Sequence, residues 1–445
     1  MTDIGAGLTV FFCLTVLALP RRLAALAYVA AAFYITQGQS LEIGDINFMA
    51  IRFVEIAAAI RVVMRREVTS IRMTSPDHWL LMFFAAYMGV TLLRVGTLDM
   101  YTIGLTVDGL LVFFTFRILI STPDEFTYFM KGMVLLLVPF ALLMIEESIK
   151  GRNSFSLMGG VPEIPIYREG YFRCQGSFRH AITAGTVGAT FFAIFVGFLF
   201  QKANRWWALI GGIASLIIVV TSHSSGPLLT TIIVCTAWCC WFFRRYMKWV
   251  RLGAVAAFIG LNLVMKAPVW YIFDRISGVI GGDGWHRANL IDKFVKSFGD
   301  WCLIGMPMEK TIGWAATVTK FGYTDITNYY ISIGINGGLI SLVIFIAMLS
   351  SCLKLVGLAL RSLRNEITIQ MNFESILWGV GSAVFAHAVN LTSVSYWDQS
   401  YVIWYLHLSV AISLGHYCLK ATTMSNTSKK DLKPATRPAF FGQGA

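Results

Sequence analysis

Residues 206–222 read WWALIGGIASLIIVVTS, an apolar run without a charged side chain, and runs of this kind recur along the whole chain. Hydrophobic residues make up 56% of the 445 residues and charged residues only 13%, about half of the fraction typical of soluble proteins. A membrane-spanning helix needs about 20 apolar residues, so the chain has room for roughly a dozen spans. The sequence therefore predicts a polytopic membrane protein and leaves no large soluble domain.

The apolar runs and the basic connections between them predict a threading. The runs lie near 4–19, 23–38, 46–64, 78–96, 102–120, 130–147, 180–200, 206–222, 226–243, 250–270, 328–351, 375–395 and 400–419. Lys and Arg resist translocation, so short basic connections mark the cytoplasmic side. All such connections fall on one side if the N-terminus is outside. We predict an all-α bundle of about 13 transmembrane helices. The net charge of +12 is then explained by the Lys and Arg residues of the cytoplasmic connections.

Two outer connections, residues 148–179 and 271–327, are much longer than the rest. Long connections usually carry function, because short ones suffice to join helices. The second contains WHRANLIDKFVKSFGDW at 285–301, whose apolar residues follow helical spacing and predict an amphipathic helix lying at the membrane surface. Residues 1–421 then form one transmembrane domain, and 422–445 form a basic, disordered cytoplasmic tail.

Cysteines give no metal-binding spacing, and most of the eight lie inside apolar runs. Cys174 and Cys302 are the two in the outer segments. They are either free thiols or, in an oxidising compartment, the two halves of a disulfide.

Both outer loops are rich in arginine on the side where basic residues are not expected. Arg168, Arg173 and Arg179 lie in the first loop, and Arg275, His286, Arg287, Asp325 and Asn328 lie in or just after the second. Guanidinium groups bind phosphate oxygens bidentately and keep their charge. The loops are therefore candidate phosphate-binding segments, with a solvated loop touching lipid headgroups as the alternative.

Short motifs at these positions resemble a known family. Arg173, Gly176, Phe178 and His180 at the mouth of a helix, TSHSSGP at 221–227, and Arg287 followed by Asn289 and Leu290 are three of them. Asn328, Tyr330 and Ile331, with Gly338 ten residues after Asn328, form the fourth. Together they are similar to segments of the bacterial O-antigen ligase and O-antigen polymerase (Wzy-like) superfamily, whose HNxYL segment the fourth resembles. Thr327 replaces that segment's His, and Asp325 lies a little upstream.

The resemblance implies a GT-C-like inverting glycosyltransferase of the bacterial inner membrane, acting at the periplasmic face on undecaprenyl-diphosphate-linked oligosaccharide. Thr327 and Asp325 favour a polymerase of O-antigen or exopolysaccharide repeat units. A ligase that transfers the glycan to lipid A core is the alternative, and a lipid-linked oligosaccharide flippase is the alternative from another class. The implied partners are the lipid-linked donor, a glycan or lipid A core acceptor, membrane lipid and a chain-length regulator, with no nucleic acid.

The chemistry assigns roles to the loop residues. Polyprenyl diphosphate is already a good leaving group, so positioning and charge stabilisation do most of the catalytic work. We expect Arg173 and Arg287 to stabilise the departing diphosphate and Asp325 to orient or deprotonate the acceptor hydroxyl, unless Asp325 only caps the helix near Asn328. The expected substrate-binding residues are Arg179, Arg275, His286, Asn328 and Tyr330. No metal or cofactor is expected, since the outer loops carry no paired-aspartate motif.

Charges inside the apolar runs need partners, because an ionisable group in a membrane is expensive. Glu55, Arg94, Asp108 and Arg117 are such residues. We expect a structural pair between Arg94 and Asp108 on neighbouring helices.

Overall fold

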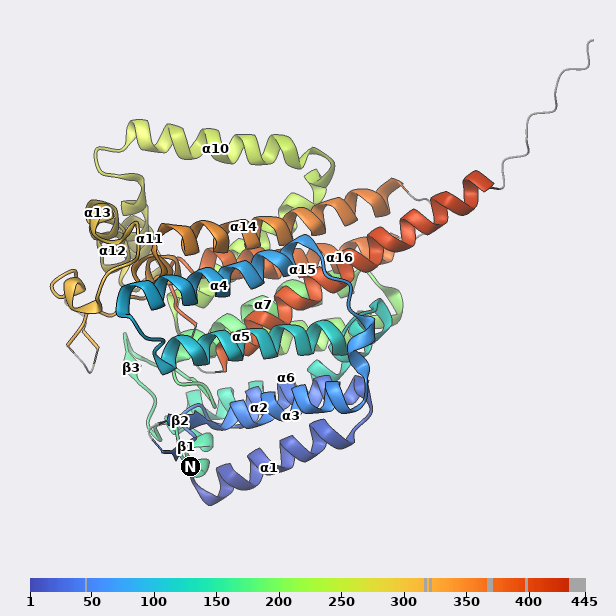
Figure 1. The fold of residues 1–445 in the computed structure, drawn as a ribbon, viewed down its shortest axis with the longest axis horizontal. Helices are drawn as coiled ribbons and strands as arrows, with labels where there is room; N and C mark the ends of the chain where they lie inside the picture. Colours follow the sequence, from blue (N-terminus) through green and yellow to red (C-terminus); the bar gives the residue numbers. More distant parts are fainter. Residues whose placement is uncertain (45, 316–317, 320–321, 366–370, 397–398, 432–445) are drawn as a thin grey trace, which may run out of the picture.

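The computed structural model describes residues 1–431 except 45, 316–317, 320–321, 366–370 and 397–398. The helices are α1 (Asp3–Ala18), α2 (Arg21–Tyr34), α3 (Ala50–Met64), α4 (Ser75–Val95), α5 (Met100–Leu119), α6 (Pro123–Lys150), α7 (Ala181–Leu199), α8 (Arg205–Thr221), α9 (Ser225–Cys239), α10 (Met247–Val264), α11 (Ile272–Ile280), α12 (Gly284–Lys296), α13 (Phe298–Trp301), α14 (Tyr329–Asn365), α15 (Met371–Asn390) and α16 (Ser400–Asp431). Two short antiparallel hairpins pair β1 (Ser40–Ile43) with β2 (Ile46–Met49) and β3 (Tyr167–Arg168) with β4 (Tyr171–Phe172). Figure 1 shows the long helices side by side as a bundle, with α10 set apart. The predicted all-α class is confirmed.

Eight helical segments of the described chain are long and apolar enough to cross a membrane. They are Ser75–Val95, Met100–Leu119, Pro123–Lys150, Ala181–Leu199, Lys202–Thr221, Ser225–Val264, Tyr329–Arg364 and Ser400–Met424. The protein is therefore a multi-pass membrane protein. Each of the predicted apolar runs contains a helix, but α1 is shorter than a full span, and Ser225–Val264 joins α9 and α10 in one segment. The finer count of thirteen spans stays a prediction.

The bundle has two chemically different ends. One, here called the loop end, carries residues 151–180 and 265–328, and the N-terminal amine donates there to the Ser40 carbonyl at 2.8 Å (Figure 1). At the opposite, basic end, Arg61 donates from Nη1 to the Leu19 carbonyl at 2.6 Å. The two long connections thus lie at the same end, as the threading predicted.

The predicted helix at 285–301 is present but differs from the expectation. It is divided into α12 and α13, which meet at Ser297, and it packs against the protein. Leu290 is fully buried, and the Phe294 ring stacks on Trp301 with centroids 4.0 Å apart. Only part of the predicted apolar face, including Val295 at 49% exposure, remains on the surface. The segment is therefore helical as predicted and packs part of its apolar face on the bundle, and its position relative to the membrane surface stays a prediction.

The chain beyond Thr422 also differs from the prediction. α16 continues to Asp431, whereas we expected a disordered tail to begin at 422. Residues 432–445, the rest of that tail, lie outside the described residues.

The expected pair between Arg94 and Asp108 is wrong. Asp108 instead binds Arg52, with Nη2 2.8 Å from Oδ2. Arg94 lies near the loop end of α4, and its Nη1 donates to the carbonyls of Met306 at 2.9 Å and Ile335 at 3.0 Å. Backbone carbonyls are available there because the helix that contains Ile335 is broken.

The break lies in α14, where Gly338 adopts φ +67° and ψ −178°. Freed backbone groups on both sides of the break find partners in the second long loop: Met306 N–H donates to the Ile335 carbonyl at 2.7 Å, and Leu339 N–H donates to the Cys302 carbonyl at 2.9 Å. Irregular backbone at membrane depth is tolerated when it is satisfied within the protein in this way. The break therefore anchors the second loop to the bundle.

Gly338→Ala should destabilise the protein. The new Cβ would lie 2.6 Å from the Leu303 carbonyl oxygen, in a backbone conformation that costs about 1–3 kcal/mol for a non-glycine residue. Thermal unfolding of the detergent-solubilised protein should show a lower melting temperature and less folded protein. Gly357→Ala in the same helix is the control, since a Cβ there meets nothing within 4 Å. Equal melting temperatures for the two variants would contradict the role of the break.

Candidate functional site

A buried carboxylate holds the first long loop in place. Glu147, 1% exposed in the last turn of α6, accepts backbone hydrogen bonds from Gln175 at 3.0 Å (Oε1) and Gly176 at 2.9 Å (Oε2). The Asn153 amide donates to the Gly176 carbonyl at 2.8 Å, so the beginning and end of the loop are joined. This clamp fixes the segment that carries Arg173.

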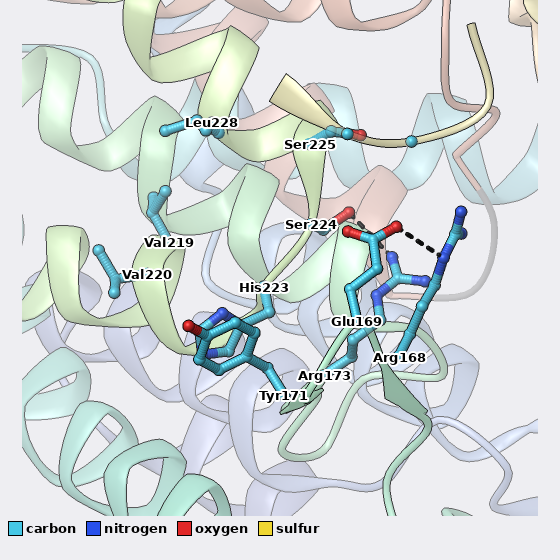
Figure 2. A pocket seen from close by; sticks show the side chains of 12 residues that line it. Arg168, Glu169, Tyr171, Arg173, Val219, Val220, His223, Ser224, Ser225 and Leu228 are labelled. Atoms are coloured by element: carbon cyan, nitrogen blue, oxygen red, sulfur yellow. Dashed lines mark hydrogen bonds and ion pairs between the residues drawn. The ribbon is translucent and has the colours of Figure 1, made fainter. Parts of the chain in front are cut away.

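A pocket of about 340 Å³ opens at the loop end beside this segment (Figure 2). Its lining comes from the β3–β4 hairpin, the turn between α8 and α9, and the chain after α11: Arg168, Glu169, Tyr171, Arg173, Val219, Val220, His223, Ser224, Ser225, Leu228, Gly281 and Gly282. Polar groups gather on the hairpin side, whereas Val219, Val220 and Leu228 are apolar. Val220 is 64% exposed and Leu228 43%, so this apolar wall reaches the outer surface of the bundle.

Side chains of the hairpin and the α8–α9 turn contact each other across the pocket. The Tyr171 ring stacks on His223, with centroids 4.5 Å apart and planes inclined by 11°. Arg173 Nη2 donates to Ser224 Oγ at 3.0 Å (Figure 2). Sequence reasoning noted the 221–227 stretch as a motif but assigned neither it nor Tyr171 to the site. The signal was present: the stretch stands at a helix junction, and nothing else in the sequence explains its serines.

Arg173 and Arg287 lie close enough for their charges to interact, although they come from different loops. Burial lowers the pKa of each guanidinium, and the neighbouring Arg168 lowers that of Arg173 further. Arg173 Nε is buried without a hydrogen-bond partner, and no described residue forms a hydrogen bond or ion pair with the Arg287 side chain. Asp283, which caps α12, is the acidic group that acts on Arg287 from nearby. Two partly buried cations with unused donors form a site suited to an anion.

His180 links these arginines to Asp325. Partial burial lowers the pKa of His180, as do the charges of Arg179 and Arg173, while Asp325 acts in the opposite direction. His180 is therefore mainly neutral near pH 7. The structure thus places Arg173, Arg179 and Asp325 near His180, and Arg173 near Arg287, at the loop end.

The other predicted residues make different contacts. Asn328 Oδ1 accepts from Ile331 N–H at 3.2 Å, so Asn328 rather than Asp325 caps the first turn of α14. The Tyr330 hydroxyl donates to the Ala388 carbonyl at 2.7 Å. His286 is buried, with Nε2 lacking a partner among the described residues. Arg275 is exposed on α11. None of these four residues lines the pocket, and a direct role in substrate binding stays a prediction for them.

The cysteines are all free, so Cys174 and Cys302 form no disulfide in this structure. Among the described residues, no three His, Cys, Asp or Glu side chains lie together as metal ligands would. The cationic groups that the pocket offers are its arginines.

No protein-family model matches the chain, and no curated protein matches it. The likeness to the O-antigen ligase and polymerase superfamily therefore rests on the short motifs alone and stays a prediction.

Glu147→Gln should loosen the first loop. A glutamine side chain has one oxygen for the two backbone N–H donors, and its NH₂ group would face the second N–H. We therefore expect the free energy of unfolding to fall by about 1–3 kcal/mol. Hydrogen exchange at Gln175 and Gly176 should become faster, and the melting temperature should fall. The adjacent Glu146→Gln is the control, because Glu146 pairs with Lys150 near the surface and does not bind the Gln175–Gly176 backbone. Unchanged exchange in Glu147→Gln would show that the clamp is dispensable.

Proposed function

We propose that the protein is a metal-independent inverting glycosyltransferase that acts on a polyprenyl-diphosphate-linked oligosaccharide. In this proposal the bundle spans the bacterial inner membrane about thirteen times in a GT-C-like arrangement, with the loop end in the periplasm. One observation carries the proposal: Arg173 and Arg287, from two different loops, share one neighbourhood beside a pocket with an apolar wall.

The charges favour a diphosphate ligand. Bringing two guanidinium groups together costs free energy unless an anion lies between or beside them. A diphosphate offers several oxygens to the donors that Arg173 and Arg287 leave unused, and guanidinium forks suit phosphate geometry. Burial strengthens these contacts because the local dielectric is low.

The shape and polarity of the pocket favour a lipid-linked ligand. Its volume of about 340 Å³ lies at the lower end of the range typical of small-ligand sites, which suits a diphosphate and one sugar. In the apolar wall, Val220 and Leu228 are exposed at the outer surface of the bundle, where a polyprenyl chain would run in the bilayer. The Tyr171–His223 stack and the serines lie on the polar side, where the first sugar would be.

The chemical step needs few groups. The acceptor hydroxyl attacks the anomeric carbon from the face opposite the diphosphate, the bond from that carbon to the diphosphate oxygen breaks, and the hydroxyl proton passes to Asp325. Arg173 and Arg287 stabilise the charge that grows on the departing diphosphate. The half-buried Asp325 makes no hydrogen bond with the described residues, so its carboxylate is available to an acceptor.

The direct experiment uses purified protein, a synthetic undecaprenyl-diphosphate repeat unit and excess chelator. We expect a ladder of polymerised glycan, because arginines rather than a metal ion stabilise the leaving group. Transfer to lipid A core without a ladder would identify a ligase. Movement of intact donor across the vesicle membrane without transfer would identify a flippase and contradict the proposed enzymatic function. A requirement for Mg²⁺ or Mn²⁺ would show that a bound ion, rather than the arginines, stabilises the leaving group.

Arg287→Lys should separate charge from geometry. Lysine keeps the charge but loses the fork, so the transfer rate should fall roughly a hundredfold, equivalent to about 3 kcal/mol, with the folded amount unchanged. Asp325→Asn should bind donor normally and transfer it slowly, since an amide cannot take the proton. Arg152→Lys is the control: this outer-loop arginine is 76% exposed at its side chain and only pairs loosely with Glu163. Normal donor affinity and rate in an Arg173→Ala, Arg287→Ala double variant would contradict the assignment.

A further inference from the structure

A second group of ionisable side chains lies inside the bundle, separate from the pocket. It joins four helices, with Tyr28 from α2, Arg52 and Glu55 from α3, Asp108 from α5 and Tyr401 from α16. Glu55 is 1% exposed and Tyr28 is fully buried. Ionisable groups within membrane helices are expensive, and they commonly mark ion or proton sites.

Only some of the polar atoms in this group have partners. Arg52 binds Asp108 through two nitrogens: Nε lies 3.0 Å from both carboxylate oxygens, and Nη2 lies 2.8 Å from Oδ2. The Tyr401 hydroxyl donates to Glu55 Oε1 at 2.6 Å. Glu55 Oε2 and the Tyr28 hydroxyl are both buried and have no hydrogen-bond partner among the described residues.

Tyr28 lies near this group, since it interacts electrostatically with both Glu55 and Asp108. Two orphaned oxygens, one of them on a carboxylate, therefore point to a missing positively charged partner. A buried polar atom without a partner costs about 1–3 kcal/mol, and more when it is charged.

The charges in the group do not balance. Two carboxylates, Glu55 and Asp108, face a single guanidinium, that of Arg52, which is the one cation that acts on Glu55 within the described chain. One negative charge is left in excess. Because an uncompensated buried charge costs several kcal/mol, one further positive charge is needed when the bundle is closed.

We propose that this group binds one monovalent cation, either as a proton on Glu55 Oε2 or as Na⁺ between Glu55 Oε2 and the Tyr28 hydroxyl. Arg52 lies at the start of α3, 19% exposed at its side chain, with Nη1 3.4 Å from the Asn47 carbonyl, so the group lies toward the loop end of the bundle. The site goes beyond the proposed glycosyl transfer, in which none of these residues takes part.

Two measurements on the purified full-length protein test the site. Infrared spectroscopy at neutral pH in choline chloride reports a protonated carboxyl group, and equilibrium binding of radioactive sodium reports Na⁺. We expect the wild type to show one of the two, and Glu55→Gln to lose it. The glutamine oxygen can still accept from Tyr401, so this variant should fold.

Asp108→Asn tests the charge count itself. Removing one negative charge leaves Arg52 to balance Glu55, so both the protonated carboxyl signal and Na⁺ binding should disappear although Glu55 is present. Glu42→Gln, at an exposed carboxylate on β1, is the control and should change neither signal. The proposal is wrong if Glu55 is ionised in the wild type and no Na⁺ binds. It is also wrong if the protonated carboxyl signal or the Na⁺ binding of the wild type survives in Glu55→Gln. If Asp108→Asn fails to fold, the comparison of wild type with Glu55→Gln decides alone.

Discussion

The break at Gly338 is the constraint on which the loop end depends. Backbone groups at membrane depth must be satisfied inside the protein, because lipid offers no hydrogen bonds. A helix interrupted there survives only if other segments supply donors and acceptors. Arg94 and Met306 satisfy the Ile335 carbonyl, and Cys302 satisfies Leu339 N–H. The second loop is therefore a structural part of the bundle, and its position follows from this requirement.

Charged groups fall into two classes that differ in how completely they are paired. Arg117 binds Asp77 at 3.0 Å inside the bundle, and Arg61 binds Glu67 at 3.1 Å at the basic end. Arg173 and Arg287, in contrast, lie near each other with donors unused. Arg117 and Arg61 each have an acidic partner, whereas no described acidic side chain forms an ion pair with Arg173 or Arg287, so these two neighbouring cations indicate a ligand that carries negative charge.

Sequence patterns predicted the helices but not the contacts between them. Apolar run length is a local property, which is why each predicted run contains a helix and why both long connections were found. The partner of Arg94 depends on residues more than two hundred positions away, and hydropathy carries no information on such a contact. Glu147 was overlooked because it ends an apolar run and resembles an ordinary helix-end carboxylate, although it holds the first loop. The clustering of Arg173 with Arg287 was expected from chemistry, because the predicted threading puts both arginines on the side where the positive-inside bias disfavours them.

The two loops reach the site through independent anchors. The first is held by Glu147 at the end of α6, and the second by the broken helix and Arg94 of α4. Since the anchors share no residue, loosening one should leave the other loop folded on the bundle. The two arginines therefore come together only when both anchors hold. Two separate sets of hydrogen bonds offset the electrostatic repulsion between them. A ligand that binds both arginines would in turn stabilise both loops, because it adds a link between the two segments.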